Sequence, residues 1–205
     1  LSGLVGSEMC IRDRLYTGAT ASTDRNFTLT AGTTSTVNVA TAASTLTMTG
    51  ASTNTTGALT KAGTGTLKLS GANLYTGLTT INAGALQYGA ANALSTGAVT
   101  VNDGGTYDLN GFSDSIGALT VNSGVTGGTV TTGAGTLTLT GNIASTGGAA
   151  NASISGNLAF AATRTITTTN AADGLTVSAV ISGAGGVTKA GAGTVTLSGA
   201  NTYTG

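Results

Sequence analysis

Hydrophobic and polar residues alternate in short stretches throughout the chain, and each stretch is closed by glycine or asparagine. In Thr66–Ser70 the apolar Leu67 and Leu69 are separated by polar residues, and Thr194–Ser198 has the same pattern. Period-two alternation places the apolar residues on one face of a β-strand and the polar residues on the other. Gly71–Asn73 follows, with residue types that accept positive φ, which predicts a turn. The pattern therefore predicts short, half-buried strands joined by tight corners.

The same alternation continues in the rest of the chain and predicts an all-β protein. No window shows apolar residues at the 3.6-residue spacing of a helix. Many short strands with near-uniform corners favour a solenoid over a sandwich or a barrel. We expect Thr126–Gly141 to form two strands and Ile143–Asn151, rich in Gly, Ala and Ser, to form a looser loop. The other expected strands are Phe27–Thr30, Thr36–Ala40, Ser44–Gly50, Leu78–Asn82, Ala85–Tyr88, Ala98–Asn102, Thr106–Asn110, Ala118–Asn122, Ile154–Thr169 and Leu175–Ile181.

One stretch of the chain occurs twice. Leu59–Gln87 begins with a sequence that returns at Val187–Gly205, at an offset of 128 residues. Self-similarity of this kind is typical of repeat architectures, in which each unit buries its apolar face against its neighbours. The predicted structural core of the repeat comprises Leu67, Leu69, Gly71, Asn73, Tyr75 and Gly77 in the first copy and Val195, Leu197, Gly199, Asn201, Tyr203 and Gly205 in the second.

The sequence of this repeat resembles a known family. Gly65–Gln87, GTLKLSGANLYTGLTTINAGALQ, is similar to the passenger-associated β-strand repeat of bacterial autotransporters. Ala91–Gly124 is similar to the coils that usually follow that repeat. The resemblance implies a right-handed parallel β-helix, a β-solenoid without a barrel in this part of the chain. With roughly 20 residues per coil we expect about nine coils.

Composition narrows the function classes. The 205 residues include 7% charged and 4% aromatic residues, no His, Pro or Trp, and a formal net charge of +0. A hydrophobic fraction of 40%, distributed in strands, favours a folded chain over a disordered one. Nucleic-acid binding is disfavoured because no cluster of Lys and Arg is present to neutralise phosphates. No apolar run is long enough for a membrane-spanning helix.

The N-terminal segment 1–14 differs from the rest and is expected to be foreign to it. Leu4–Arg14 contains four of the chain's fourteen charged residues and its only cysteine, Cys10. The peptide resembles a translated transposase-type sequencing adapter, so we interpret 1–14 as an artefact, the alternative being a genuine charged cap. We therefore expect Met9 and Cys10 to pack poorly. Residues 15–205 are interpreted as a single β-solenoid segment, truncated at both ends.

Three acids form the one cluster that suggests catalysis. Asp103, Asp108 and Asp114 lie close together in the sequence, and acids on adjacent coils of a β-helix can serve carbohydrate chemistry. Each lies beside Gly, Asn or Ser, however, where Asx side chains commonly hold turns. Asn102–Leu109 also partly matches a calcium-binding nonapeptide, but its glycine pattern is broken. We predict no catalytic, metal-binding or cofactor-binding residue, and the structural interpretation is preferred.

Two other residue types recur at the corner of the repeat. Asn73 and Asn201 are expected to form side-chain amide ladders along the solenoid. Tyr75 and Tyr203 are expected to pack at the corner rather than to serve as exposed anchors.

These observations predict a non-catalytic, surface-exposed or secreted segment of an autotransporter passenger. By the resemblance, its partners are host or neighbouring-cell surface molecules or further copies of itself, not nucleic acid. The resemblance also implies a Gram-negative-type outer membrane, reached through a C-terminal barrel outside this chain. The alternatives are a carbohydrate-active β-helix enzyme and a secreted repeat protein anchored by another route.

Overall fold

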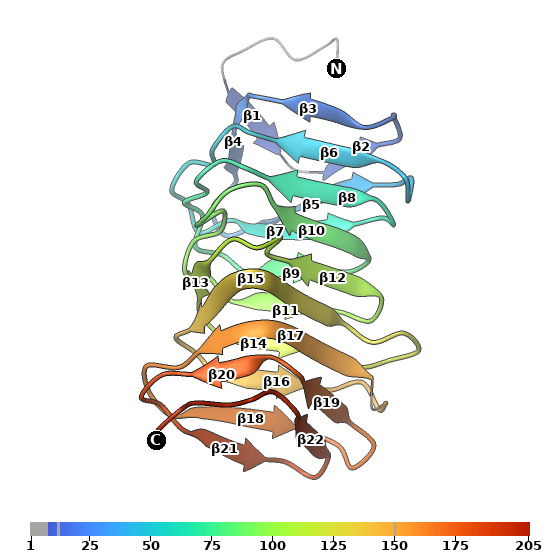
Figure 1. Ribbon diagram of the computed structural model, residues 1–205. Helices are drawn as coiled ribbons and strands as arrows, with labels where there is room; N and C mark the ends of the chain where they lie inside the picture. Colours follow the sequence, from blue (N-terminus) through green and yellow to red (C-terminus); the bar gives the residue numbers. More distant parts are fainter. Residues whose placement is uncertain (1–7, 12, 150) are drawn as a thin grey trace.

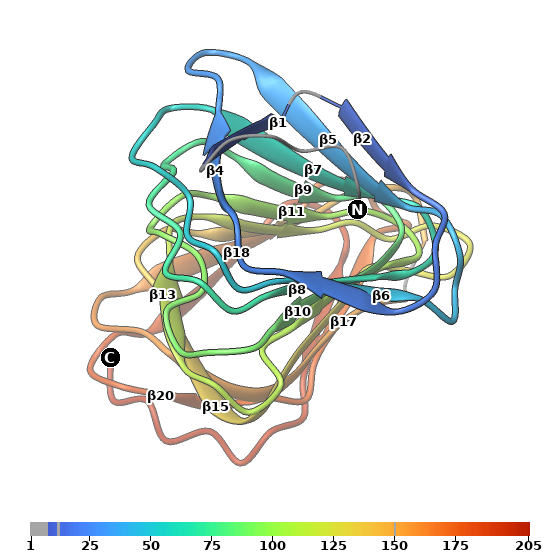
Figure 2. The same ribbon diagram turned by 90° about the horizontal axis from the view of Figure 1, so that it is seen from above.

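The chain is a parallel β-solenoid of about eight turns, as the sequence predicted. The computed structural model describes residues 8–11, 13–149 and 151–205. Among these residues every element is a strand, and every strand pairing is parallel. Successive coils stack from the N-terminal to the C-terminal end (Figure 1). Viewed from the N-terminal end, the chain runs clockwise as it recedes, which makes the coil right-handed (Figure 2).

One wall of the solenoid is a nine-stranded parallel sheet. Each coil contributes one strand, so the spatial order of strands follows the sequence order. The strands are β2 (Asp13–Tyr16), β5 (Thr34–Val39), β7 (Ala58–Ala62), β9 (Thr79–Ile81), β11 (Val99–Val101), β14 (Leu119–Val121), β16 (Ile143–Ser145), β18 (Arg164–Thr168) and β21 (Val187–Ala190).

An eleven-stranded sheet forms the opposite wall and turns into a third face. Its main path contains β3 (Ala21–Thr23), β6 (Thr45–Met48), β8 (Thr66–Leu69), β10 (Gly84–Tyr88), β12 (Gly105–Asp108), β15 (Thr129–Leu139), β17 (Ala152–Ala159), β19 (Gly174–Val177) and β22 (Thr194–Leu197). Off this path, β13 (Asp114–Ile116) pairs with β15 and β20 (Val180–Ser182) pairs with β17. At the N-terminal end, β1 (Glu8–Ile11) pairs with β4 (Asn26–Leu29).

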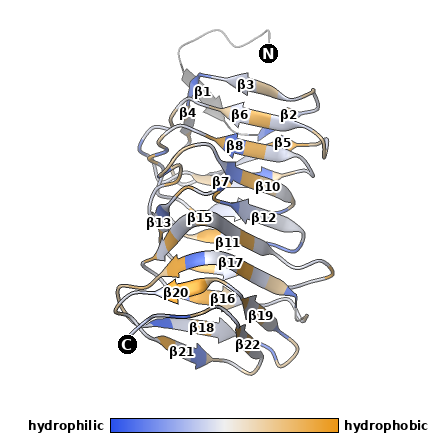
Figure 3. Cartoon of the chain, in the orientation of Figure 1, coloured by the Kyte–Doolittle hydropathy of each residue, from blue (hydrophilic) through white to orange (hydrophobic). Residues whose placement is uncertain are grey.

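The core lies inside the coil because the period-two pattern is kept in register from one coil to the next. Leu46, Leu67 and Leu86 are partners on adjacent strands of the eleven-stranded sheet, and all three are buried. Val99 and Leu119 are partners in the same way on the facing wall. Buried apolar and more exposed polar residues alternate within single strands, as in β8. Hydrophobic and hydrophilic residues are accordingly mixed along the strands (Figure 3). Each coil therefore buries its apolar face only against its neighbours, as a repeat architecture requires.

Three sequence predictions about elements are wrong. Leu175–Ile181 was expected as one strand, but it is divided between β19 and β20. Ile143–Asn151 is not wholly a loop, because Ile143–Ser145 is strand β16, in which Ile143 pairs with Leu119 and Ile166 inside the core. Thr126–Gly141 holds one long strand, β15, rather than two. The chain bends within β15 at Gly133, where φ is +60°, and the register with β17 shifts there. A glycine that interrupts the alternation can thus bend a strand without ending it.

The N-terminal segment takes part in the sheets. The backbone of Glu8–Ile11 pairs with Asn26–Leu29, and Asp13–Tyr16 pairs with Thr36–Val39. Leu1–Ser7, Arg12 and the side chains of Met9 and Cys10 lie outside the described residues. The interpretation of segment 1–14 as foreign therefore stays a prediction. In the described residues, no helix is long and apolar enough to cross a membrane.

Candidate functional site

The corner of the repeat connects three successive coils through Asn73. The Asn73 side-chain oxygen accepts a hydrogen bond from the Ser52 backbone N–H of the preceding coil at 2.9 Å. Its amide nitrogen donates to the Gly71 carbonyl at 3.0 Å and to the Ala93 carbonyl of the following coil at 2.7 Å. Because Asn73 is only 2% exposed, these three bonds form away from water. Asn201 repeats the first of them, accepting from the Ile181 N–H at 2.9 Å.

The side-chain amide ladders expected at this corner do not form: Asn73 and Asn201 bond to backbone groups. The two residues lie 128 positions apart, and Asn73 bonds to backbone groups of the adjacent coils instead. A corner backbone has unpaired N–H and C=O groups, and a buried Asn satisfies both kinds with one side chain. The corner asparagine is therefore a link between coil backbones.

An asparagine ladder does form at a different corner, which the sequence analysis did not single out. The Asn102 amide donates to Oδ1 of Asn82 at 2.7 Å, and the Asn122 amide donates to Oδ1 of Asn102 at 2.8 Å. Each asparagine directly follows a strand of the nine-stranded sheet, β9, β11 or β14. The signal was the constant spacing of 20 residues in the motifs INAG, VNDG and VNSG.

The remaining predicted core residues of the first copy are buried or lie where adjacent coils approach closely. Leu67 and Leu69 are fully buried, and Tyr75 is buried with its hydroxyl 2.9 Å from Oγ1 of Thr79. A Cβ on Gly71 would lie 2.4 Å from the Gly50 carbonyl oxygen, and one on Gly77 would lie 2.2 Å from that of Gly57. Both positions therefore require glycine, because adjacent coils approach too closely for any side chain.

The second copy has the same arrangement in the last coil. A Cβ on Gly199 would lie 2.1 Å from the Ala179 carbonyl oxygen, and one on Gly205 would lie 2.6 Å from that of Ala184. Val195, Leu197 and Tyr203 pack against the core but are only partly buried.

A lysine at the start of each repeat is a further link that sequence reasoning missed. Lys61 is 0% exposed, and its ammonium donates to the carbonyls of Ala62 and Gly63, each at 2.8 Å. It also donates to the Ala83 carbonyl of the next coil at 3.1 Å. Desolvation by burial lowers the Lys61 pKa from 10.5 to about 8. Lys189 makes the equivalent first two bonds, to Ala190 and Gly191.

The three clustered acids occupy different environments. Asp103 accepts hydrogen bonds from the backbone N–H groups of Val125, Thr126 and Gly127 in the next coil, at 2.7 to 2.9 Å, and these bonds lower its pKa. Asp108 accepts from the Gln87 amide at 2.8 Å and from the Asn110 N–H at 2.7 Å. Both acids therefore hold turns and coil contacts, as Asx residues commonly do.

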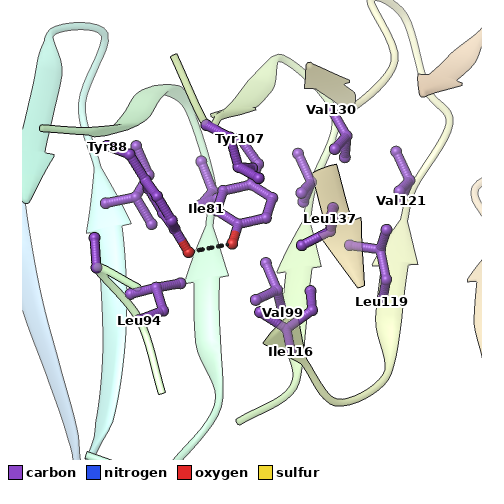
Figure 4. Close-up of a cluster of buried hydrophobic side chains, with 14 of the residues drawn as sticks. Ile81, Tyr88, Leu94, Val99, Tyr107, Ile116, Leu119, Val121, Val130 and Leu137 are labelled. Atoms are coloured by element: carbon purple, nitrogen blue, oxygen red, sulfur yellow. Dashed lines mark hydrogen bonds between the residues drawn. The ribbon is translucent and has the colours of Figure 1, made fainter. Parts of the chain in front are cut away.

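Asp114 lies inside the solenoid, where it meets two buried tyrosines. The Tyr88 hydroxyl donates to Oδ2 of Asp114 at 2.5 Å. It also lies 2.5 Å from the Tyr107 hydroxyl (Figure 4). The two rings meet edge to face, with centroids 5.6 Å apart. Burial raises the Asp114 pKa, against the opposing effect of hydrogen bonds from Tyr88 and from the N–H groups of Ser115 and Leu94. Asp114 thus serves a buried polar cluster, while Asp103 and Asp108 lie on the outside of the wall.

This arrangement does not supply the pair of facing carboxylates that carbohydrate cleavage uses. Across residues 8–11, 13–149 and 151–205, no three His, Cys, Asp or Glu side chains gather closely enough to hold a metal ion. The features that the repeats share are structural: a lysine that bonds to the carbonyls of its own corner, an asparagine that bonds to the preceding coil, and glycines that let the coils approach.

Comparison with known proteins identifies the repeated unit. The family model described as passenger-associated-transport-repeat matches residues 59–87 and 187–205, the same two stretches found by internal self-similarity. No curated protein and no solved structure matches the chain.

Proposed function

Because the chain carries two passenger-associated-transport-repeats in a parallel β-solenoid, we propose that it is a segment of an autotransporter passenger. In this proposal the segment is exported by type V secretion and displayed at the surface of a Gram-negative cell or released from it. Its work is mechanical: it is a stalk that holds an adhesive or effector region away from the membrane.

The observation that carries the proposal is the position of the repeats in the wall. In each copy, Asn and Lys side chains bond to corner backbone groups, and Asn73 and Lys61 reach the adjacent coils. The repeat therefore transmits the stacking of one coil to the next. We assign no catalytic step to the segment, since its acids serve turns and the core.

The structure also favours folding after export. Each coil is completed by contacts with its immediate neighbours, so the solenoid can grow coil by coil as the chain emerges. Apart from Cys10 in the segment interpreted as foreign, the chain has no cysteine that could form a disulfide in an oxidising compartment.

The location can be tested in cells that express the full gene. Antibodies raised against residues 15–205 should label intact cells, and external protease should remove the signal without lysis. Labelling only after permeabilisation would contradict surface display.

The adhesive role is tested separately. Cells with an in-frame deletion of 15–205 should bind host or neighbouring cells less well while still displaying the distal region. If deletion leaves adhesion unchanged, the segment is not a stalk for adhesion. Concentration-dependent association of the isolated chain in analytical ultracentrifugation would add self-association to its partners.

A further inference from the structure

The outward face of the nine-stranded sheet has three rows of side chains, each formed by residues that stack from one coil to the next. Register pairs Thr60 with Thr80, Thr80 with Thr100 and Thr100 with Thr120, so the threonines stack in one row across four coils. Thr36 extends the row by one coil. On one side of it lies a row of apolar residues, and on the other lies the asparagine ladder. The row face is defined by Ala58, Leu78, Ala98 and Ala118; Thr36, Thr60, Thr80, Thr100 and Thr120; and Asn82, Asn102 and Asn122.

The row face has no charge. In the described strands from β5 to β16, no outward side chain of this sheet is Asp, Glu, Lys or Arg, and Lys61 points inward. The row from Thr60 to Thr120 advances by 20 residues per coil, so the spacing is constant there. A neutral, regularly spaced face is matched by a neutral, regularly spaced partner rather than by an acidic or basic one.

The side chains of the row face are also rigid. Threonine is branched at Cβ and stiff at χ1, and alanine has no rotamers to lose. The asparagine amides are held by their bonds to each other at 2.7 and 2.8 Å. The four threonines from Thr60 to Thr120 make no side-chain hydrogen bond within the described residues, so their hydroxyls face solvent. Such a surface loses little side-chain entropy when it binds a fixed lattice.

From these features we propose that the row face binds ice. Strands in a sheet lie about 4.8 Å apart, and alternate residues in one strand lie roughly 6.8 Å apart. The first spacing is close to the repeat of oxygen rows along the a axis of hexagonal ice. The threonine hydroxyls and asparagine amides supply hydrogen-bonding groups at that repeat, and the threonine and alanine methyl groups order the water between them.

The composition of the row face argues against a soluble sugar chain as the partner. Sugar rings pack on aromatic side chains, whereas Tyr75, Tyr88 and Tyr107 are buried in the core. The proposal does not depend on how the chain is secreted.

The test is inhibition of ice recrystallisation by the purified 205-residue chain, with crystal shape observed below the freezing point. Thr100→Tyr places a bulky aromatic ring at the centre of the row face, where it keeps the face from contacting ice. It should increase the concentration needed for the same inhibition at least about tenfold. The matched control is Thr106→Tyr, at an outward position of the eleven-stranded sheet, and it should act like the unsubstituted chain. Thr80→Tyr provides a second disrupting variant should Thr100→Tyr fail to fold by circular dichroism.

Absence of ice shaping and inhibition by the unsubstituted chain would overturn the proposal. Equal losses of ice-recrystallisation inhibition in Thr100→Tyr and Thr106→Tyr would overturn it as well. A chain that has no ice activity but is retained on insoluble cellulose, or self-associates through the row face, would assign this surface to a polysaccharide or to a second copy instead.

Discussion

The Asn102 side-chain amide lies 2.7 Å from the Asn82 side-chain oxygen, although 20 residues separate them in the chain. The same contact is made by Asn122 to Asn102 at 2.8 Å. A bond of this kind forms only when successive coils have equal length and the same register. The ladder therefore records the regularity of the three coils that contain it, and it stabilises that regularity at the corner.

Replacing Asn102, the central residue of the asparagine ladder, should weaken the stacking of the coils. Asn102→Ala removes both ladder bonds, and we expect it to lower the free energy of unfolding by about 1–2 kcal/mol, since each net hydrogen bond contributes about 0.5–1.5 kcal/mol. Asn54→Ala is the control, because Asn54 is exposed and its side chain makes no hydrogen bond within the described residues. Urea unfolding of both variants checks this, and equal stability of the two would mean that the ladder contributes nothing.

The buried tyrosine cluster should be more sensitive to loss of a hydroxyl than the repeat corner. Tyr88→Phe leaves the Asp114 carboxyl and the Tyr107 hydroxyl each short of a buried partner. We expect a loss of about 2–3 kcal/mol, because a buried polar group left unpaired costs about 1–3 kcal/mol. Tyr75→Phe removes a single contact, to Thr79, and should cost about 1 kcal/mol. Thermal or urea unfolding checks this. A larger loss of stability for Tyr75→Phe than for Tyr88→Phe would contradict the hydrogen bonds assigned to Tyr88.

Lys61 should make stability depend on pH. Burial lowers its pKa in the folded chain to about 8, against 10.5 for a solvated lysine. Between these values the unfolded chain holds one proton more than the folded chain, so the free energy of unfolding should rise as pH increases. Lys61→Met lacks this titrating group, so its free energy of unfolding should rise less over the same pH range.

The comparison is made by urea unfolding of both chains at several values from about pH 8 to just below pH 10. Above that range the tyrosines of the unfolded chain lose protons while the buried Tyr75 keeps its own, which would lower the stability and mask the effect of Lys61. Parallel pH profiles for the two chains would show that Lys61 is not the titrating group. A fall in stability of the unsubstituted chain relative to Lys61→Met would reverse the sign and reject the burial argument.

The glycine at the corner after the repeat lysine should tolerate no side chain. Gly63 has φ of +77°, and a Cβ there would lie 2.2 Å from Oδ1 of Asn38 and 2.3 Å from the Val39 carbonyl oxygen. Gly32 has a similar φ of +70° but open space around it. Gly32→Ala should cost about 1–2 kcal/mol from backbone strain alone. Gly63→Ala should cost clearly more, and equal melting temperatures for the two variants would show that the coils can separate at that corner.

Most of the fold could be predicted from the sequence because alternation and corner residues repeat with little variation. Thr66–Ser70 was expected as a strand, and β8 covers Thr66–Leu69. The errors fall where a coil departs from the common pattern. A lone Ile143 among small residues fills a core position, and Gly133 bends β15 without ending it.

The contacts of the repeat were harder to predict than its outline. The repeat suggested that Asn73 recurs for a structural reason, but two of its three partners come from segments about 20 residues before and after it. The contacts of Lys61 could not be predicted, because nothing in LTKAG shows that a following coil will place the Ala83 carbonyl beside it. Partners of this kind depend on stacking, which one coil's sequence does not contain.

All of these contacts depend on the stacking register of the coils, and cross-linking tests that register most directly. In a Cys10→Ser background, Thr80→Cys with Thr100→Cys places two thiols on adjacent strands, about 5 Å apart in a parallel sheet. Dibromobimane, which fluoresces when both of its arms have reacted, should link this pair within one chain. Thr80→Cys with Thr120→Cys lies two coils apart, at roughly 10 Å, and should give little signal. Efficient linkage of the second pair, or failure of the first, would contradict the parallel coil stack described here.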